Sequence, residues 1–335
     1  MDDQVTRPAV VVTRRLPDTV ESALAERFDV RLNGDDHPMS PGELRAALRE
    51  ADALLCTVTD SLTADVFAME SCRARIVANF GVGYNHIDME AARRLALVVT
   101  NTPDVLTDDT ADLAIALMLA VARRMGEGER QLRAGNWTGW RPTHLMGTRV
   151  TGKTLGIVGF GRIGQAVAHR ARSGFGMSVL FASRGPVADE VVAGAAAGAE
   201  QRPLDALLAE ADFVSLHVPA TPATYHLIDA SRLRMMRRNA FLINTARGDV
   251  VDEIALIDAL QAGTIAGAGL DVYQQEPSVP EALMALTNVV LLPHLGSATM
   301  ESRTAMGMRA VENLVAFFEG REPPDVVAVV DSGAG

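Results

Sequence analysis

Short apolar runs alternate with amphipathic stretches along most of the chain. In the first hundred residues a helical pattern covers 20–28, a helix start is expected at Ser40, and the apolar runs lie at 9–13, 53–58, 76–79 and 98–100. Alternation of short β-type runs with helical segments is typical of a parallel sheet covered by helices. We therefore predict a compact α/β domain of about 100 residues at this end of the chain.

The same rhythm resumes in the second half, after a long helical pattern that is expected to run from Asp108 to Arg124. The predicted strands there are 154–158, 177–181, 212–219, 241–248, 267–272 and 289–294, and a last helical pattern covers 306–319. A chain of 335 residues exceeds the size at which a single core keeps growing. The fold class is therefore α/β with two domains, each built on a parallel sheet.

Composition narrows the class of function. The net charge is −11 and no basic block occurs, which argues against a nucleic-acid or membrane-surface partner. Cys56 and Cys72 have neither metal-ligand spacing nor the density of a disulfide scaffold, so reduced thiols in a cytoplasmic protein are expected.

His86 and Asp88 have no further ligands beside them, and no metal site is predicted. The N-terminus lacks a signal pattern, and the longest apolar helical stretch, 113–122, is too short to span a membrane.

A glycine-rich turn follows the predicted strand 154–158 and precedes an alanine-rich helical pattern. Its residues are Gly159, Phe160, Gly161, Arg162, Ile163 and Gly164. In this context Gly159 permits the turn, Gly161 lets the backbone approach a pyrophosphate, and Gly164 lets the helix sit close to the strand. The free N–H groups of the helix start then bind the anion. A dinucleotide site is predicted here, although glycine turns also serve as plain connections between a strand and a helix.

The residues after the next predicted strand bear on the choice of cofactor. A site for NAD usually places a carboxylate there for the ribose 2′-hydroxyl, whereas this chain has Ser183 and Arg184. A guanidinium is a planar, permanently charged phosphate binder. NADP(H) is therefore favoured as cofactor, and NAD(H) stays possible if Arg184 is only a solvated loop charge.

Three polar residues of the second half follow the ends of predicted strands: Arg247, Glu276 and His294. Arginine can hold a substrate carboxylate with two hydrogen bonds, histidine can give a proton to a developing alkoxide at neutral pH, and a glutamate beside it stabilises imidazolium. Taken singly they are more often a salt bridge, a surface acid and a strand-end histidine. Together, at the sheet edge that carries the glycine turn, they form the set that a dehydrogenase of 2-hydroxy acids needs.

Two further segments carry weaker signals. Gly81 and Gly83 follow a predicted strand end, where exposed N–H groups can hold an anion or simply form a tight turn. Both tryptophans of the chain, Trp137 and Trp140, lie in the irregular segment 135–142. They indicate an interface, a pocket wall or a hydrophobic anchor.

These motifs resemble those of the D-isomer-specific 2-hydroxyacid dehydrogenases, and most closely those of glyoxylate/hydroxypyruvate reductases. The resemblance rests on the blocks 82–88, 100–107, 139–142, 152–159, 244–248, 269–277 and 293–299. It implies two Rossmann-like or flavodoxin-like parallel-sheet domains. Residues 1–101 and 295–335 would form a discontinuous substrate domain, with the dinucleotide-binding domain 102–294 inserted between its two parts.

The resemblance also implies roles for single residues. Arg247 would bind the carboxylate, His294 would donate the proton, and Glu276 would be its partner. The substrate pocket would involve Val82, Gly83, Leu106, Trp140 and Arg247. Cofactor contacts outside the glycine turn would come from Thr110, Ser183, Arg184, Pro219, Thr245, Asp271 and His294. The segment around Trp140 would form an arm that joins a homodimer.

The reaction that the resemblance implies is the NAD(P)H-dependent reduction of glyoxylate or hydroxypyruvate to the D-2-hydroxy acid. Two alternatives stay open. One is a dehydrogenase of another D-2-hydroxy acid, or of phosphite or a phosphonate, on the same scaffold. The other is a dinucleotide-sensing protein of the corepressor type, against which the complete set of catalytic residue types argues.

Overall fold

The computed structural model describes residues 7–327, which fall into two compact units. The first unit runs up to Leu106 and takes up the chain again at Thr299, and the second unit is Thr107–Ala298. The expected domain borders, 101/102 and 294/295, lie a few residues before the two points at which the chain passes from one unit to the other. The second unit is thus an insertion between the two parts of the first.

The first unit is built on a five-stranded parallel sheet in the order β2-β1-β3-β4-β5. This is the flavodoxin-like order of a doubly wound sheet. Its elements are β1 (Ala9–Val12), α1 (Asp18–Arg27), β2 (Asp29–Arg31), α2 (Pro41–Glu50), β3 (Ala53–Thr57), α3 (Ala64–Phe67), β4 (Ile76–Phe80), α4 (Met89–Arg94), β5 (Val98–Thr100) and α13 (Met300–Phe318).

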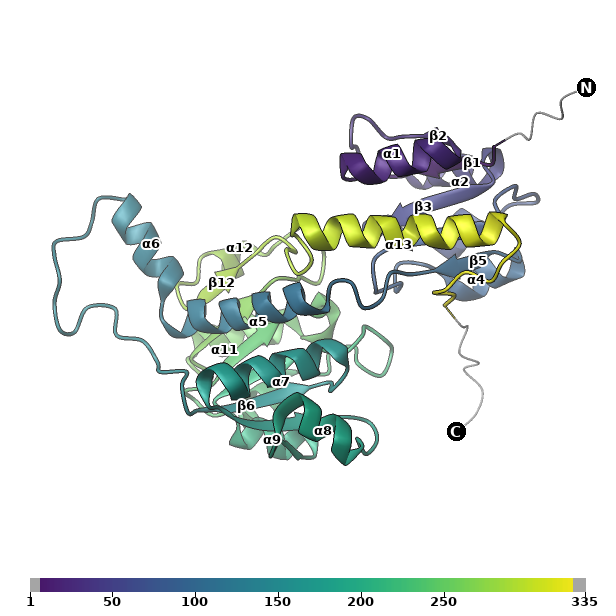
Figure 1. Ribbon diagram of the computed structural model, residues 1–335. Helices are drawn as coiled ribbons and strands as arrows, with labels where there is room; N and C mark the ends of the chain where they lie inside the picture. Colours follow the sequence, from purple (N-terminus) through teal and green to yellow (C-terminus); the bar gives the residue numbers. More distant parts are fainter. Residues whose placement is uncertain (1–6, 328–335) are drawn as a thin grey trace, which may run out of the picture. The chain divides into compact units, whose positions relative to one another are not determined.

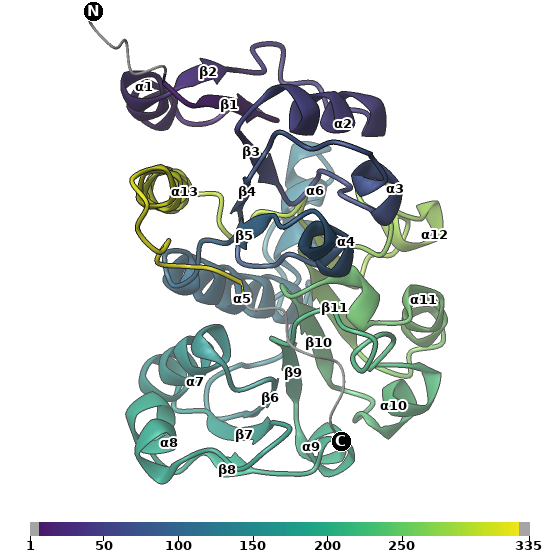
Figure 2. The ribbon, with the colours of Figure 1, turned by 90° about the vertical axis from the view of Figure 1, so that its right-hand side faces the viewer.

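Helices cover both faces of this sheet. Figure 2 shows α1 and α13 on one side of the strands and α2, α3 and α4 on the other. All side chains of β3 and β4 are buried, which explains why their sequences are continuous apolar runs and do not alternate. The predicted helix start is also confirmed, because Ser40 and Glu43 form a reciprocal capping box at the first turn of α2.

The second unit contains a seven-stranded parallel sheet in the order β12-β11-β10-β9-β6-β7-β8. The order outward from β6 is that of a Rossmann fold with one added strand. Its strands are β6 (Thr154–Val158), β7 (Ser178–Ala182), β8 (Glu200–Gln201), β9 (Phe213–Leu216), β10 (Phe241–Asn244), β11 (Gly267–Leu270) and β12 (Val289–Leu291). Its helices are α5 (Thr107–Ala122), α6 (Met125–Arg133), α7 (Arg162–Phe175), α8 (Asp189–Ala196), α9 (Leu204–Glu210), α10 (Ala230–Met235), the short η1 (Gly248–Val250), α11 (Glu253–Gln261) and α12 (Glu281–Met284).

This second sheet also has two helical layers, with α5, α7 and α8 on one face and α9, α10, α11 and α12 on the other (Figure 2). The predicted strands are found, but four end earlier than predicted, at Leu216, Asn244, Leu270 and Leu291. The reason is clear for β10. There the Asn244 side chain accepts a hydrogen bond from Ala246 N and donates one to Arg247 O, which turns the chain out of the ladder.

The long helix predicted from Asp108 to Arg124 is wrong in its extent. The structure has α5 up to Ala122 and a separate α6 from Met125, because Arg124 adopts a left-handed conformation with φ 55°. No residue of α6 is buried, and the helix and the irregular segment after it stand away from the rest of the second unit (Figure 1). We call residues 125–148 the arm.

The last helix is also longer than predicted. α13 begins at Met300, not near residue 306, and Thr299 caps it by accepting a hydrogen bond from Ser302 N. The edge strands β2 and β8 were not predicted, since runs of three and two mostly exposed residues carry little apolar signal.

Candidate active site

The glycine turn between β6 and α7 has the backbone geometry that a dinucleotide requires. Gly159 has φ 96°, and a Cβ there would lie 2.5 Å from the carbonyl oxygen of His217. A Cβ on Gly164 would lie 2.2 Å from the carbonyl oxygen of Gly159. A Cβ on Gly161, in contrast, would meet no atom within 4 Å. Two glycines are thus needed for close packing, and the third faces open space that a pyrophosphate can enter.

The donors at this turn are available to an anion. Gly161 is the N-cap of the 14-residue helix α7, and no side chain caps its first N–H groups. Phe160 is buried and its ring stacks on Phe181 with centroids 4.0 Å apart, which holds the turn against the sheet. Thr245 Oγ1 is buried and has no hydrogen-bond partner among residues 7–327, so a polar group of a ligand would satisfy it. The residues present therefore fit a bound dinucleotide.

The turn after β7 lacks a carboxylate, as predicted from the sequence. Ser183 Oγ donates a hydrogen bond of 2.5 Å to Gly185 O. Arg184 is exposed, and no described residue forms a hydrogen bond or an ion pair with its guanidinium. This turn presents a free positive charge at the end of the strand next to the glycine turn.

His294 and Glu276 form a pair. Nδ1 of His294 lies 2.7 Å from Oε2 of Glu276, and Tyr273 N donates a hydrogen bond of 3.1 Å to Oε1 of the same carboxylate. Burial alone would raise the pKa of Glu276. The hydrogen bond and charge of His294, the N–H of Tyr273 and the charge of Arg247 outweigh burial and hold this pKa below its usual value. The carboxylate therefore stays ionised beside the imidazole.

Arg247 follows β10 on a loop shaped by buried contacts. Burial lowers the pKa of its guanidinium, and the charge of Glu276 opposes this shift. Asn244, which is 1% exposed, donates to Arg247 O and so fixes the backbone at this position. The next residue, Gly248, packs so closely on the peptide between Tyr273 and Gln274 that a Cβ would lie 1.9 Å from Tyr273 C. The loops that carry Arg247 and Glu276 are thereby in direct contact.

Asp271 supports the turn that carries His294. Its carboxylate accepts hydrogen bonds from Leu295 N at 2.6 Å and Gly296 N at 2.8 Å, and its carbonyl oxygen accepts one from His294 N at 2.9 Å. Burial raises the pKa of Asp271, and these N–H groups and the charge of His294 counteract it. His294 has φ 55°, a conformation that a non-glycine residue keeps only when its surroundings impose it. Asp271 supplies that constraint.

The other residues expected at the cofactor are distributed over this unit. Thr110, at the start of α5, is buried and donates a hydrogen bond of 2.9 Å to Gly296 O. Pro219 is exposed after β9, and its carbonyl oxygen accepts a hydrogen bond from Thr224 Oγ1. Arg162 is exposed and Ile163 is partly buried against the core beside α7.

The expected substrate residues of the first unit follow β4 and precede α5. Asn79 donates hydrogen bonds of 3.0 Å to the carbonyl oxygens of Gly81 and Gly83, and Asn101 donates one of 2.9 Å to Val82 O. No described residue accepts a hydrogen bond from the N–H groups of Val82 and Gly83. These two N–H groups are therefore available to a ligand. Leu106 is partly buried against the core of the first unit.

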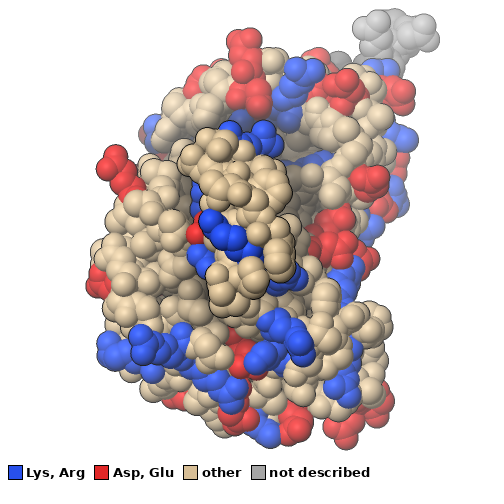
Figure 3. Space-filling view, turned by 90° about the vertical axis from the view of Figure 1, so that its left-hand side faces the viewer, with Lys and Arg blue, Asp and Glu red and all other residues tan. Residues whose placement is uncertain are grey.

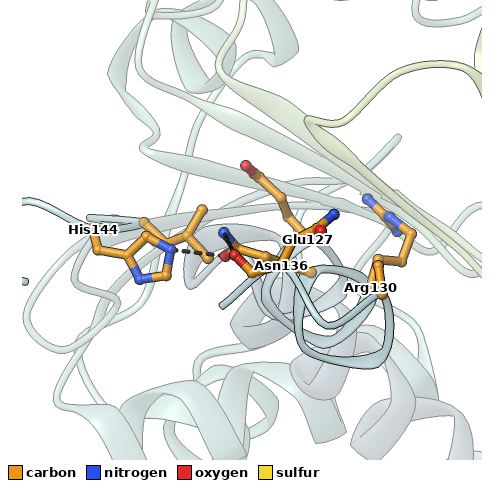
Figure 4. A pocket seen from close by; sticks show the side chains of 7 residues that line it. Glu127, Arg130, Asn136 and His144 are labelled. Carbon is orange, nitrogen blue, oxygen red and sulfur yellow. Dashed lines mark hydrogen bonds between the residues drawn. The ribbon is translucent and has the colours of Figure 1, made fainter. Parts of the chain in front are cut away.

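The arm bears a separate pocket. Glu127, Arg130, Asn136 and His144 are among its lining residues, and His144 Nε2 lies 2.7 Å from Gln131 Oε1 (Figure 4). None of the expected catalytic or cofactor residues lines it. On this side of the molecule Lys and Arg side chains lie among uncharged residues (Figure 3), and the arm exposes five large apolar side chains: Met125, Leu132, Trp137, Trp140 and Met146.

Comparison with known proteins agrees with this geometry. The sequence pattern described as "D-isomer specific 2-hydroxyacid dehydrogenase, NAD binding domain" matches residues 115–296. The chain belongs to this family. It is 47% identical to a glyoxylate reductase of Thermococcus litoralis over 96% of this chain and 97% of that protein. It is 45% identical to a glyoxylate reductase of Aeropyrum pernix, with 96% of each chain covered.

A solved structure of the family is similar over nearly the whole chain. It is that of an NADPH-dependent glyoxylate/hydroxypyruvate reductase from Sinorhizobium meliloti in complex with NADP and malonate. The sequence identity is 37%, the TM-score is 0.85, and the match covers 96% of this chain and 97% of the other. The predicted family, the α/β fold and the class of oxidoreductase with a Rossmann-type NAD-binding domain are confirmed. Within residues 7–327, no helix has the length and apolar character needed to cross a membrane.

Sequence reasoning did not identify three residues that shape this site. Asn244, Tyr273 and Gln201 act through hydrogen bonds to loops that carry the predicted residues. For Asn244 a signal existed, because a polar residue that ends a buried apolar strand commonly caps the turn after it. Tyr273 and Gln201 have no such sequence signal.

The glycine turn yields a test of dinucleotide binding. Replacing Gly164 by Ala places a Cβ against Gly159 O, so the turn must open and the dissociation constant for NADPH should rise by about tenfold or more. Gly174→Ala, in the same helix with open space around it, is the matched control and should bind as wild type does. Fluorescence titration measures both. Equal affinities in the two variants would remove the glycine turn from the site.

Proposed function

We propose that the protein reduces glyoxylate or hydroxypyruvate to the corresponding D-2-hydroxy acid with a reduced nicotinamide dinucleotide. The main support for this proposal is the 2.7 Å contact between His294 Nδ1 and Glu276 Oε2. The charge of Arg247 acts on the same carboxylate. The glycine turn and these residues lie in one unit, whose parallel strands all end at the same edge. The names of the relatives from Thermococcus litoralis and Sinorhizobium meliloti support this substrate class.

Each side chain has a task in this reaction. The nicotinamide, when bound, supplies the hydride that reduces C2 of the substrate. Arg247 holds the substrate carboxylate through its planar guanidinium. His294 gives a proton from Nε2 to the oxygen on C2, while Glu276 Oε2 holds Nδ1 and stabilises the imidazolium.

We propose NADP(H) as the favoured cofactor, with NAD(H) as the alternative. The support is the exposed, unpaired guanidinium of Arg184 beside Ser183, where a carboxylate would be expected for a free 2′-hydroxyl. The NADPH dependence of the relative from Sinorhizobium meliloti points the same way. Thr110, Pro219, Thr245 and Asp271 complete the expected cofactor contacts.

We also propose a homodimer that forms through the arm. Trp140 is 81% exposed and Met146 is 66% exposed, and single-chain proteins rarely leave such large apolar side chains together in water. A second copy would cover them, and Trp140 would then also contribute to the substrate pocket. Sedimentation velocity of the chain at micromolar concentration should give the mass of a dimer. Trp140→Asp should shift the population toward monomer, whereas a wild-type monomer would contradict the proposal.

The proton donor is tested by His294→Ala. Loss of the imidazole should lower kcat for glyoxylate, followed by the absorbance of NADPH, by about 100-fold or more. The circular dichroism spectrum should be unchanged, because the His294 side chain is partly exposed at a loop and its loss leaves the core intact. His169→Ala, which removes an exposed histidine on α7, is the control and should keep wild-type turnover. Undiminished turnover in His294→Ala would rule out this role.

The ionised Glu276 makes a prediction about pH. Its pKa is lowered in the folded protein, so the interaction with His294 is present above the ordinary pKa of a glutamate and is lost as the pH falls through the lowered value. Glu276→Gln keeps the shape but removes the charge that favours imidazolium. The decline of kcat/KM at acidic pH, where Glu276 takes up its proton in the wild type, should therefore be absent from the profile of Glu276→Gln.

The control is Glu281→Gln, which neutralises an exposed acid at the start of α12. Its pH profile should superimpose on that of the wild type. A profile of Glu276→Gln that keeps the acidic decline would show that the carboxylate has no electrostatic part in proton transfer.

A further inference from the structure

The turn after β7 is held by a side chain from the neighbouring strand. Gln201 lies on β8, paired with Phe181, two residues before Ser183. Its Nε2 lies 2.9 Å from Ser183 Oγ and 2.9 Å from Gly185 O. A carbonyl oxygen can only accept a hydrogen bond, so the amide nitrogen must face this turn and both of its N–H groups are used there. Gln201 thus contacts the two residues that flank Arg184.

The hydroxyl of Ser183 is already engaged in this arrangement. It accepts from Gln201 Nε2 and gives its single proton to Gly185 O at 2.5 Å. A phosphate oxygen has no proton at neutral pH to offer, so Ser183 can contact it only by turning its O–H away from Gly185. Gly185 O would then lose one donor and keep the one from Gln201. The hydrogen bond from the Gln201 amide to Gly185 O therefore lowers the free energy that is needed to turn the Ser183 hydroxyl away from Gly185.

Arg184 gains from the same contacts. Its guanidinium is exposed and makes no ion pair with a described residue. The position of the Arg184 side chain therefore depends only on the backbone of the turn. The nearest acid of β8, Glu200, is paired with Arg202 and does not compete for it. With both neighbours held by Gln201, less conformational freedom is lost when the guanidinium closes on an anion.

We propose that Gln201 is a positioning residue for the 2′-phosphate of the cofactor: it holds the turn 183–185 in the form that binds phosphate and makes the Ser183 hydroxyl available to it. This inference rests on the proposed preference for NADP(H). It adds to that proposal a residue that does not itself need to contact the phosphate.

The test replaces Gln201 by Leu, which keeps the size of the side chain and removes both N–H groups. The Michaelis constant for NADPH and the dissociation constant of adenosine 2′,5′-bisphosphate should each rise by about fivefold to tenfold, the effect of losing hydrogen bonds of ordinary strength. The values of kcat, of KM for NADH and of the dissociation constant of adenosine 5′-monophosphate should stay within about twofold. Titration calorimetry of the two adenosine nucleotides gives a readout that is independent of turnover.

Two reference variants accompany it. Arg184→Ala removes the proposed phosphate ligand itself and should abolish the preference for NADPH. Gln261→Leu changes an exposed glutamine at the end of α11 that makes no side-chain hydrogen bond to a described residue, and it should behave as wild type.

The outcomes separate the two proposals. Equal use of NADPH and NADH by the wild type, unchanged in Arg184→Ala, would overturn the proposed cofactor preference and the role of Gln201 with it. A wild type that prefers NADPH, an Arg184→Ala variant that does not, and a Gln201→Leu variant that still does would overturn the role of Gln201 alone. Weaker binding of both adenosine nucleotides in Gln201→Leu would also overturn it, because the turn would then have lost its structure and not its selectivity.

Discussion

The parallel hydrogen-bonded ladder of the seven-stranded sheet is the constraint on which the site depends. Parallel strands deliver all their carboxyl ends to one edge, so residues that are far apart in the chain meet there without any sequence proximity. The glycine turn after β6, Arg247 after β10, Glu276 after β11 and His294 after β12 all follow from this one geometry. Hydride transfer, carboxylate binding and proton donation require such convergence, since each reacting atom must be held at contact distance.

Loops at this edge would be mobile without buried polar side chains to hold them. Asn244 and Asp271 are 1% and 0% exposed. Asn244 bonds the backbone of the loop after its own strand, β10, and Asp271 bonds the backbone of the loop after the neighbouring strand, β12. Tyr273 joins two of these loops, because its N–H reaches Glu276 and its hydroxyl donates to Leu292 O at 2.9 Å. Burial raises the pKa of that hydroxyl to about 12, so it remains a donor at any physiological pH. The candidate catalytic side chains Glu276 and His294 are partly exposed, whereas the side chains that hold their loops are buried.

Under the proposed cofactor assignment, two different physical principles recognise two parts of the dinucleotide, the pyrophosphate and the ribose that carries the 2′-hydroxyl or 2′-phosphate. At the glycine turn the discrimination is steric, since the chain approaches the pyrophosphate only where side chains are absent. At the turn 183–185 it is electrostatic, and depends on a guanidinium and on the direction of one hydroxyl proton. The second principle is more easily altered by single substitutions.

Much of this protein is determined by the sequence alone. Apolar runs between helical patterns predict both parallel sheets, and the glycine spacing and the strand-end residues predict the family, because local burial and backbone freedom are encoded in adjacent residues. The break at Arg124 and the short strand β8 were not predicted, since each depends on contacts or conformations that residue type does not encode. Only the tertiary structure places Gln201 against Ser183 and Tyr273 between two loops. Hydrogen bonds between residues distant in the chain depend on how the strands stack side by side, and that is decided when the sheet assembles.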